Sequence, residues 1–144
     1  MEKWFGSSAV CINDNNEVLM VLQGKPEEEK TWTVPSGGLE NNETYEACCL
    51  REFEEETGFV GEIVGEITKK QGNARTYDIA IEVHYFLVKI IGGERVIQDP
   101  DNLIYNIAWK TLEDLKILDL SFPEDRALLM HYIENRAVLK NIDC

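Results

Sequence analysis

The 144-residue chain carries 27 acidic and 14 basic residues, which give a formal net charge of −13. Such an excess of negative charge lacks the basic footprint that nucleic acid requires, so no nucleic acid polymer is expected as a partner. The length predicts one domain over residues 1–144. No run of 18 apolar residues and no signal-peptide pattern is found, so we expect no membrane span and a cytoplasmic location.

The four cysteines agree with a reducing compartment. They are Cys11, Cys48, Cys49 and Cys144, and they form neither a paired framework nor a Cys-x-x-Cys motif. Cys48 and Cys49 are neighbours in a helical stretch, where small buried apolar residues are expected. The cysteine pattern therefore gives no support for a zinc site.

The hydrophobic pattern predicts strands and helices in a mixed order. Apolar alternation and turn residues predict strands at 7–12, 17–22, 32–35, 59–68, 76–91 and 103–109. Helical stretches are predicted at 44–57 and 122–139, with a short turn of helix or a loop at 113–118. The last helix is expected to start at Ser121, whose spacing to Glu124 fits a capping box. This order predicts an α/β fold in which a sheet lies between helices.

The first of these helices concentrates negative charge. Glu52 and Glu56 stand at i,i+4, where like charges cost a few tenths of a kcal/mol on an isolated helix. At about 100° per residue, Glu52, Glu55 and Glu56 fall within one arc, and Glu54 points away toward solvent. Arg51 lies one turn before Glu55 and can orient that carboxylate. Hard oxygen ligands of this kind suit Mg²⁺ or Mn²⁺, whereas the alternative is a solvated acidic helix face.

The spacing around this helix resembles the Nudix box. Gly37 is followed after five residues by Glu43, and after seven more by Arg51-Glu52-Phe53-x-Glu55-Glu56-x-Gly58-Phe59. The resemblance implies the α/β/α sandwich of Nudix hydrolases, with a mixed sheet between helices. It also implies Mg²⁺-dependent (or Mn²⁺-dependent) hydrolysis of a pyrophosphate bond in a nucleoside diphosphate linked to a group X.

The resemblance assigns roles to individual residues. Glu52, Glu55 and Glu56 match the metal-binding glutamates, and the Gly37 carbonyl often joins that metal shell. Glu43 and Arg51 match positions that shape the loop and helix by ion pairing, and Gly58 is well placed to terminate the helix. We expect Glu55, Glu52 and Arg51 to be the catalytic residues, with Glu55 as the general base. The loop carboxylates Asp99 and Asp101 are the alternative bases and are also candidate substrate-binding residues.

The substrate is the part that the resemblance leaves open. A small nucleotide is expected, with a nucleoside triphosphate of the MutT type ahead of ADP-ribose, another nucleotide sugar, or a dinucleoside polyphosphate. Gln23 stands where many relatives have a substrate-contacting arginine, and Lys25 is a candidate replacement. Tyr77 lies at a position loosely associated with dinucleoside polyphosphate cleavage. A non-catalytic nucleotide-sensing module is the alternative of another class, and a homodimer is compatible with the sequence, although nothing in it defines an interface.

Overall fold

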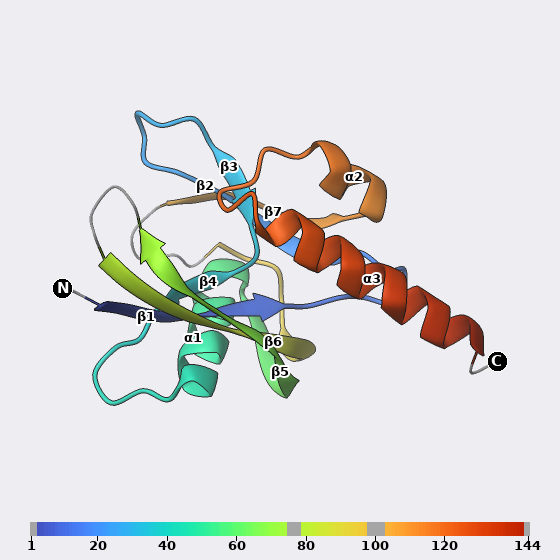
Figure 1. Ribbon diagram of the computed structural model, residues 1–144, viewed down its shortest axis with the longest axis horizontal. Coiled ribbons are helices and arrows are strands. Elements are labelled where there is room, and N and C mark those ends of the chain that lie inside the picture. Colours follow the sequence, from blue (N-terminus) through green and yellow to red (C-terminus); the bar gives the residue numbers. More distant parts are fainter. Residues whose placement is uncertain (1–2, 75–78, 98–102, 143–144) are drawn as a thin grey trace.

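The computed structural model describes residues 3–74, 79–97 and 103–142, and it forms an α/β fold (Figure 1). The strands are β1 (Lys3–Val10), β2 (Val18–Gln23), β3 (Thr31–Thr33), β4 (Ser36–Gly38), β5 (Phe59–Ala74), β6 (Ile79–Gly93) and β7 (Ile104–Lys110). The helices are α1 (Tyr45–Thr57), α2 (Leu112–Ile117) and α3 (Asp125–Ile142). No helix within the described ranges is long and apolar enough to cross a membrane.

The strands are divided between two sheets. The larger sheet is mixed and has the order β4-β1-β6-β5, with β1 parallel to β6 and the other pairs antiparallel. The smaller sheet, β3-β2-β7, is antiparallel. The expected α/β class with a mixed sheet is thus confirmed, with a second small sheet that the residue pattern alone does not separate from the first.

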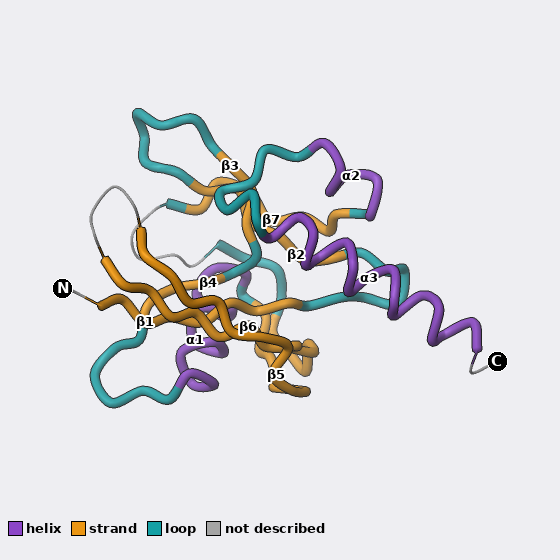
Figure 2. The backbone as a smooth tube through the Cα atoms, viewed as in Figure 1, coloured by secondary structure: helices purple, strands orange, loops and turns teal. Residues whose placement is uncertain are grey.

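A helix packs on part of each face of the larger sheet (Figure 2). On one face, Cys49 and Phe53 of α1 pack on Phe86 and Val88 of β6; on the other, α3 packs on the alternate residues of β6. Adjacent β1 residues divide in the same way between the two cores. Phe53 is completely buried, and truncating such a side chain to alanine costs about 3–5 kcal/mol.

The last helix begins later than the sequence predicts. α3 starts at Asp125, and Ser121 does not cap it. Instead, the Ser121 amide donates to the Trp32 carbonyl at 2.9 Å, and its hydroxyl lies 2.6 Å from the Thr31 hydroxyl. Since β3 binds this segment as an extended chain, the predicted capping box is wrong. A capping box does form at the shorter helix α2.

Candidate functional site

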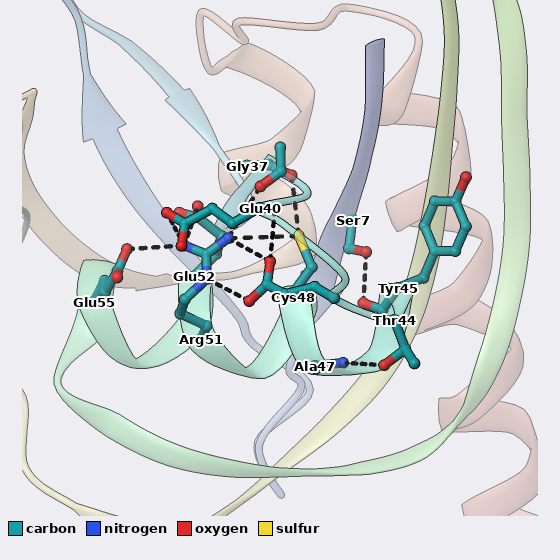
Figure 3. A network of polar contacts seen from close by, with 12 residues as sticks. Ser7, Gly37, Glu40, Thr44, Tyr45, Ala47, Cys48, Arg51, Glu52 and Glu55 are labelled. Carbon is teal, nitrogen blue, oxygen red and sulfur yellow. Dashed lines mark hydrogen bonds and ion pairs between the residues drawn. The ribbon is translucent and has the colours of Figure 1, made fainter.

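Helix α1 has well-defined ends, which hold its carboxylates at fixed positions. The Thr44 hydroxyl accepts a hydrogen bond from the Ala47 amide at 3.0 Å, satisfying one of the free donors of the first turn (Figure 3). The helix ends at Gly58, whose φ of 83° places it in the left-handed region that favours glycine. A Cβ at Gly58 would lie only 2.2 Å from the Glu94 carbonyl oxygen.

The N-terminus of α1 is also anchored to the larger sheet through a polar network. Tyr45 stacks on His84 of β6, with ring centroids 3.5 Å apart, and its hydroxyl donates to Glu82 at 3.0 Å. The two His84 ring nitrogens lie 2.7 Å from Glu66 and 2.9 Å from Glu82. Hydrogen bonds from His84, Gln71 and Tyr45 lower the pKa of Glu82 to about 2.

Gly37 lies directly against the carboxylate of Glu52 (Figure 3). A Cβ built at Gly37 would lie between 2.2 and 2.6 Å from the three carboxyl atoms of Glu52, so only glycine allows this approach. The Cys48 thiol on the same helix lies 3.5 Å from the Gly37 carbonyl oxygen. The glycine strand β4 and the second turn of α1 therefore form one compact unit.

Arg51 connects the loop before α1 to the acidic face of the helix (Figure 3). Its guanidinium binds Glu43 through two hydrogen bonds, of 2.6 Å from Nε and 2.9 Å from Nη2. Nη2 also donates to the Gly38 carbonyl at 3.0 Å. Nη1 reaches Glu52 at 2.8 Å and Glu55 at 3.3 Å. The predicted hydrogen bond from Arg51 to Glu55 is present. The paired fork between Arg51 and Glu43 is of a type that is among the strongest hydrogen-bonded arrangements.

The pKa values of these groups follow from the contacts. The hydrogen bond from Arg51 lowers the pKa of Glu43, and the same bond raises the pKa of Arg51 above its ordinary value. Burial, followed by the charge of Glu52, raises the pKa of Glu55, while Arg51 opposes both effects. Carboxylates crowd one guanidinium, so a further cation would relieve their repulsion.

Glu54 and Glu56, on the same helix, lie in different environments. Glu54 is exposed, as predicted, whereas Glu56 is buried with only 5% of its surface accessible. Burying a glutamate is costly unless its charge is compensated, and Glu56 does have an interaction in the structure. Glu56 is therefore not part of a solvated acidic face.

The chemistry of this donor set fits a hard divalent cation. It offers the carboxylates of Glu52, Glu55 and Glu56 and the carbonyl of Gly37, all oxygen ligands. Over the described ranges, however, no three Asp, Glu, His or Cys side chains converge on one point. The guanidinium of Arg51 lies between Glu52 and Glu55 instead, so binding a cation would require these carboxylates to turn away from Arg51.

Of the other predicted site residues outside the box, the structure describes Lys25 alone. Lys25 is exposed in the loop between β2 and β3, which folds on itself through Lys30 Nζ donating to the Lys25 carbonyl at 2.6 Å. Tyr77, Asp99 and Asp101 lie outside the described residues.

The sequence pattern did not predict two contacts of the Arg51 cluster. Glu40 forms an ion pair with Arg51 at 3.5 Å, although 68% of its side chain is exposed. Cys48 contributes its thiol to the Gly37 carbonyl, as described above. The position of Cys48, one turn before Arg51 on the same face of the helix, is the only sequence signal for its contact.

Comparisons with known proteins agree with the resemblance of residues 37–59 to the Nudix box. The family profile described as the NUDIX domain matches residues 4–132. The chain is 30% identical to an RNA pyrophosphohydrolase of Zymomonas mobilis over 80% of this chain and 82% of that protein. It is 27% identical to an 8-oxo-(d)GTP phosphatase of Mycolicibacterium smegmatis over 77% of this chain and 33% of that protein.

Solved structures with a similar fold include Nudix hydrolases. A NUDIX hydrolase from Nitrosomonas europaea superposes with a TM-score of 0.79 at 19% identity, over 95% of this chain and 90% of that one. Across the curated relatives that it matches, the chain spans between 27% and 82% of the relative's length. Several of these relatives are therefore much longer proteins.

Proposed function

The chain belongs to the Nudix family, and on this premise we propose that it hydrolyses a pyrophosphate bond in a nucleoside diphosphate linked to a group X, with Mg²⁺ or Mn²⁺ as cofactor. The observation that carries the proposal is the contact between Gly37 and the Glu52 carboxylate, beside the guanidinium of Arg51. This contact places hard oxygen donors next to a glycine strand, which a phosphate group can approach closely.

Each residue of the cluster has a role in this proposal. Glu52, Glu55 and Glu56, with the Gly37 carbonyl, would hold the cation. A bound divalent cation neutralises phosphate oxygens and makes a water molecule more acidic. Glu55, whose side chain is 34% exposed, is reached by solvent and would accept the proton of the attacking water. Arg51, bound to Glu43, would set the direction of the carboxylates.

A small nucleotide is the proposed substrate, and a nucleoside triphosphate of the MutT type is the first choice. The match to a protein named as an 8-oxo-(d)GTP phosphatase supports this choice. ADP-ribose, another nucleotide sugar and a dinucleoside polyphosphate are the alternatives. The match to a protein named as an RNA pyrophosphohydrolase supports an RNA substrate, but the net charge of −13 disfavours a polyanionic polymer.

The test is phosphate release from a nucleotide panel with Mg²⁺, with and without added inorganic pyrophosphatase, which also reveals pyrophosphate as a product. We expect Glu55→Gln to lower kcat by at least about 10²-fold, since general-base catalysis contributes 10²–10⁴. Glu54→Gln is the matched control, because Glu54 is exposed on the same helix. A Glu55→Gln protein within tenfold of wild type would move the base elsewhere, with Asp99 and Asp101 next in line.

The non-catalytic alternative predicts a different result. A sensing module would bind a nucleotide but turn over none of the panel at saturating Mg²⁺ and Mn²⁺. Folded protein with this behaviour would overturn the proposed hydrolase activity.

A further inference from the structure

A pocket lies on the face of the larger sheet opposite α1. In one row across the sheet, Gly38 pairs with Gly6, Gly6 with Val83, and Val83 with Lys70. Two glycines side by side leave a depression in the sheet, and the Trp4 ring lies across it. A Cβ at Gly6 would be 2.4 Å from Trp4 Cη2, and one at Gly38 would be 3.1 Å from Trp4 Nε1.

The pocket encloses about 270 Å³ and is largely apolar. Two aromatic side chains at its rim, Trp4 and Phe122, keep 42% and 43% of their surface exposed. Its lining comes from all four strands and from the segment before α3: Trp4, Ser8, Ser36, Lys70, Ile81, Val83, Tyr85 and Phe122. Exposed aromatic rings beside an apolar floor suit a flat ring system, because such rings gain from stacking.

Lys70 is the one charged residue among those that line this pocket. Its ammonium group forms ion pairs with Glu124 at 3.0 Å and Asp125 at 3.6 Å, and it lies 4.7 Å from the centre of the Phe122 ring. An ammonium group has three N–H donors and no acceptor. Within the described ranges these two carboxylates are its polar partners, so a third donor remains for a ligand.

The pocket and the Arg51 cluster meet at β4. Ser36 lines the pocket, and the next residue, Gly37, faces α1 and contacts Glu52, because alternate residues of a strand point to opposite faces. β4 is an edge strand of the larger sheet. A nucleotide with its base in the pocket can thus pass around β4 and bring its phosphates to Gly37.

We propose that Lys70 determines which base this site accepts, by donating a hydrogen bond to a carbonyl on the edge of a base stacked at Trp4 and Phe122. The inference rests on the proposed function. A donor-only group favours a keto base such as hypoxanthine, guanine or uracil over adenine, whose amino group is itself a donor. The site is therefore selective for keto nucleotides.

ITP and ATP test the selectivity, because their bases differ at the position that carries oxygen in one and an amino group in the other. We expect kcat/KM for ITP to exceed that for ATP by about 10- to 100-fold, the range of a hydrogen bond to a charged group. The difference should lie in KM, since contacts made equally in the ground and transition states do not change kcat.

Three substitutions complete the test. Lys70→Met should bring the ITP to ATP ratio toward one, while Lys70→Arg, which restores a charged donor, should recover the preference. Lys69→Met is the matched control, since Lys69 is exposed and pairs with His84, one residue out of phase with the pocket. Its ratio should equal that of wild type. Thermal unfolding of each variant checks that the fold is retained.

Binding keeps this inference separate from the hydrolase proposal. Calorimetric titration with IMP and AMP should show tighter binding of IMP, and the preference should disappear in Lys70→Met. Turnover of ITP and ATP at equal kcat/KM, or a preference unchanged in Lys70→Met, would overturn the role of Lys70 but not the activity. Absence of turnover together with Lys70-dependent binding of IMP would overturn the activity alone, and absence of both would overturn both.

Discussion

Gly37→Ala should separate the activity of this protein from its stability. The added Cβ would lie 2.2 Å from the Glu52 carboxyl carbon, whereas ordinary contacts begin at 3.4 Å, so the carboxylate must move by about 1.2 Å. The group that moves is the end of a flexible side chain. Among the described glycines, positive φ values occur at Gly24, Gly58 and Gly93, so alanine can adopt the backbone of Gly37.

The expected cost to stability is therefore small. Replacing glycine by alanine at a compatible position stabilises by about 0.4–1 kcal/mol through the unfolded chain, which offsets the displacement of Glu52. Activity should fall much further, because a misplacement of 1 Å at a reacting site can cost about 10²-fold. We expect kcat/KM for the preferred nucleotide to fall by about 10²-fold, with a free energy of unfolding within about 1 kcal/mol of wild type.

The assay pairs steady-state hydrolysis at saturating Mg²⁺ with urea unfolding of the same preparations. Gly65→Ala is the control, since a Cβ at Gly65 meets no atom within 4 Å. A folded Gly37→Ala protein with activity within threefold of wild type would refute the reasoning. It would mean that catalysis does not require the Glu52 carboxylate to lie beside Gly37.

Three further predictions follow from the pKa values and the helix end. Glu43→Gln should reduce the free energy of unfolding at pH 7, because Arg51 lowers the folded-state pKa of Glu43. The difference in unfolding free energy between variant and wild type should shrink as the pH falls below about 4.3 toward that lowered pKa. Urea titrations at several pH values would measure it. Burial raises the pKa of the Cys11 thiol to about 11 and that of the Cys49 thiol to about 12. Peptide mapping after iodoacetamide treatment at pH 8 should therefore show both thiols unlabelled until urea unfolds the chain. Rapid labelling of either thiol in the folded protein would contradict this burial. Gly58→Ala should destabilise by more than about 1 kcal/mol, since φ there is 83° and the Cβ would meet the Glu94 carbonyl; an unchanged urea midpoint would show that the helix end adapts.

The arrangement of Arg51 has a consequence for metal binding. Its guanidinium lies between Glu52 and Glu55, at 2.8 and 3.3 Å, the same carboxylates that the proposed function assigns to Mg²⁺. The firm anchor of Arg51 is Glu43, which binds it through two hydrogen bonds. Under the proposed function, Glu52 and Glu55 would exchange their contacts to Arg51 for the cation, while Glu43 holds Arg51 in place.

The sequence alone predicts those features of this protein that depend on residues close together in the chain. Helix α1, its end at Gly58, the exposure of Glu54 and the pairing of Arg51 with Glu55 all depend on residues within one or two helical turns. The spacing from Gly37 to the helix belongs to the same short segment and points to the Nudix fold. Interactions over such short separations are determined by the helical period, which a sequence displays directly.

The long-range part was decided by tertiary structure. Ser121 has the spacing of a capping residue, yet it binds Thr31, because a distant strand competes for the same groups. The pocket joins Trp4 of β1, Lys70 of β5 and Phe122 of the segment before α3, which lie far apart in the chain. A register shift of one residue in β1 or β5 would send Trp4 or Lys70 to the opposite face of the sheet. The sequence by itself thus determined the family and the proposed reaction centre, while strand register and the packing of the segment before α3 decided which residues surround the proposed base pocket.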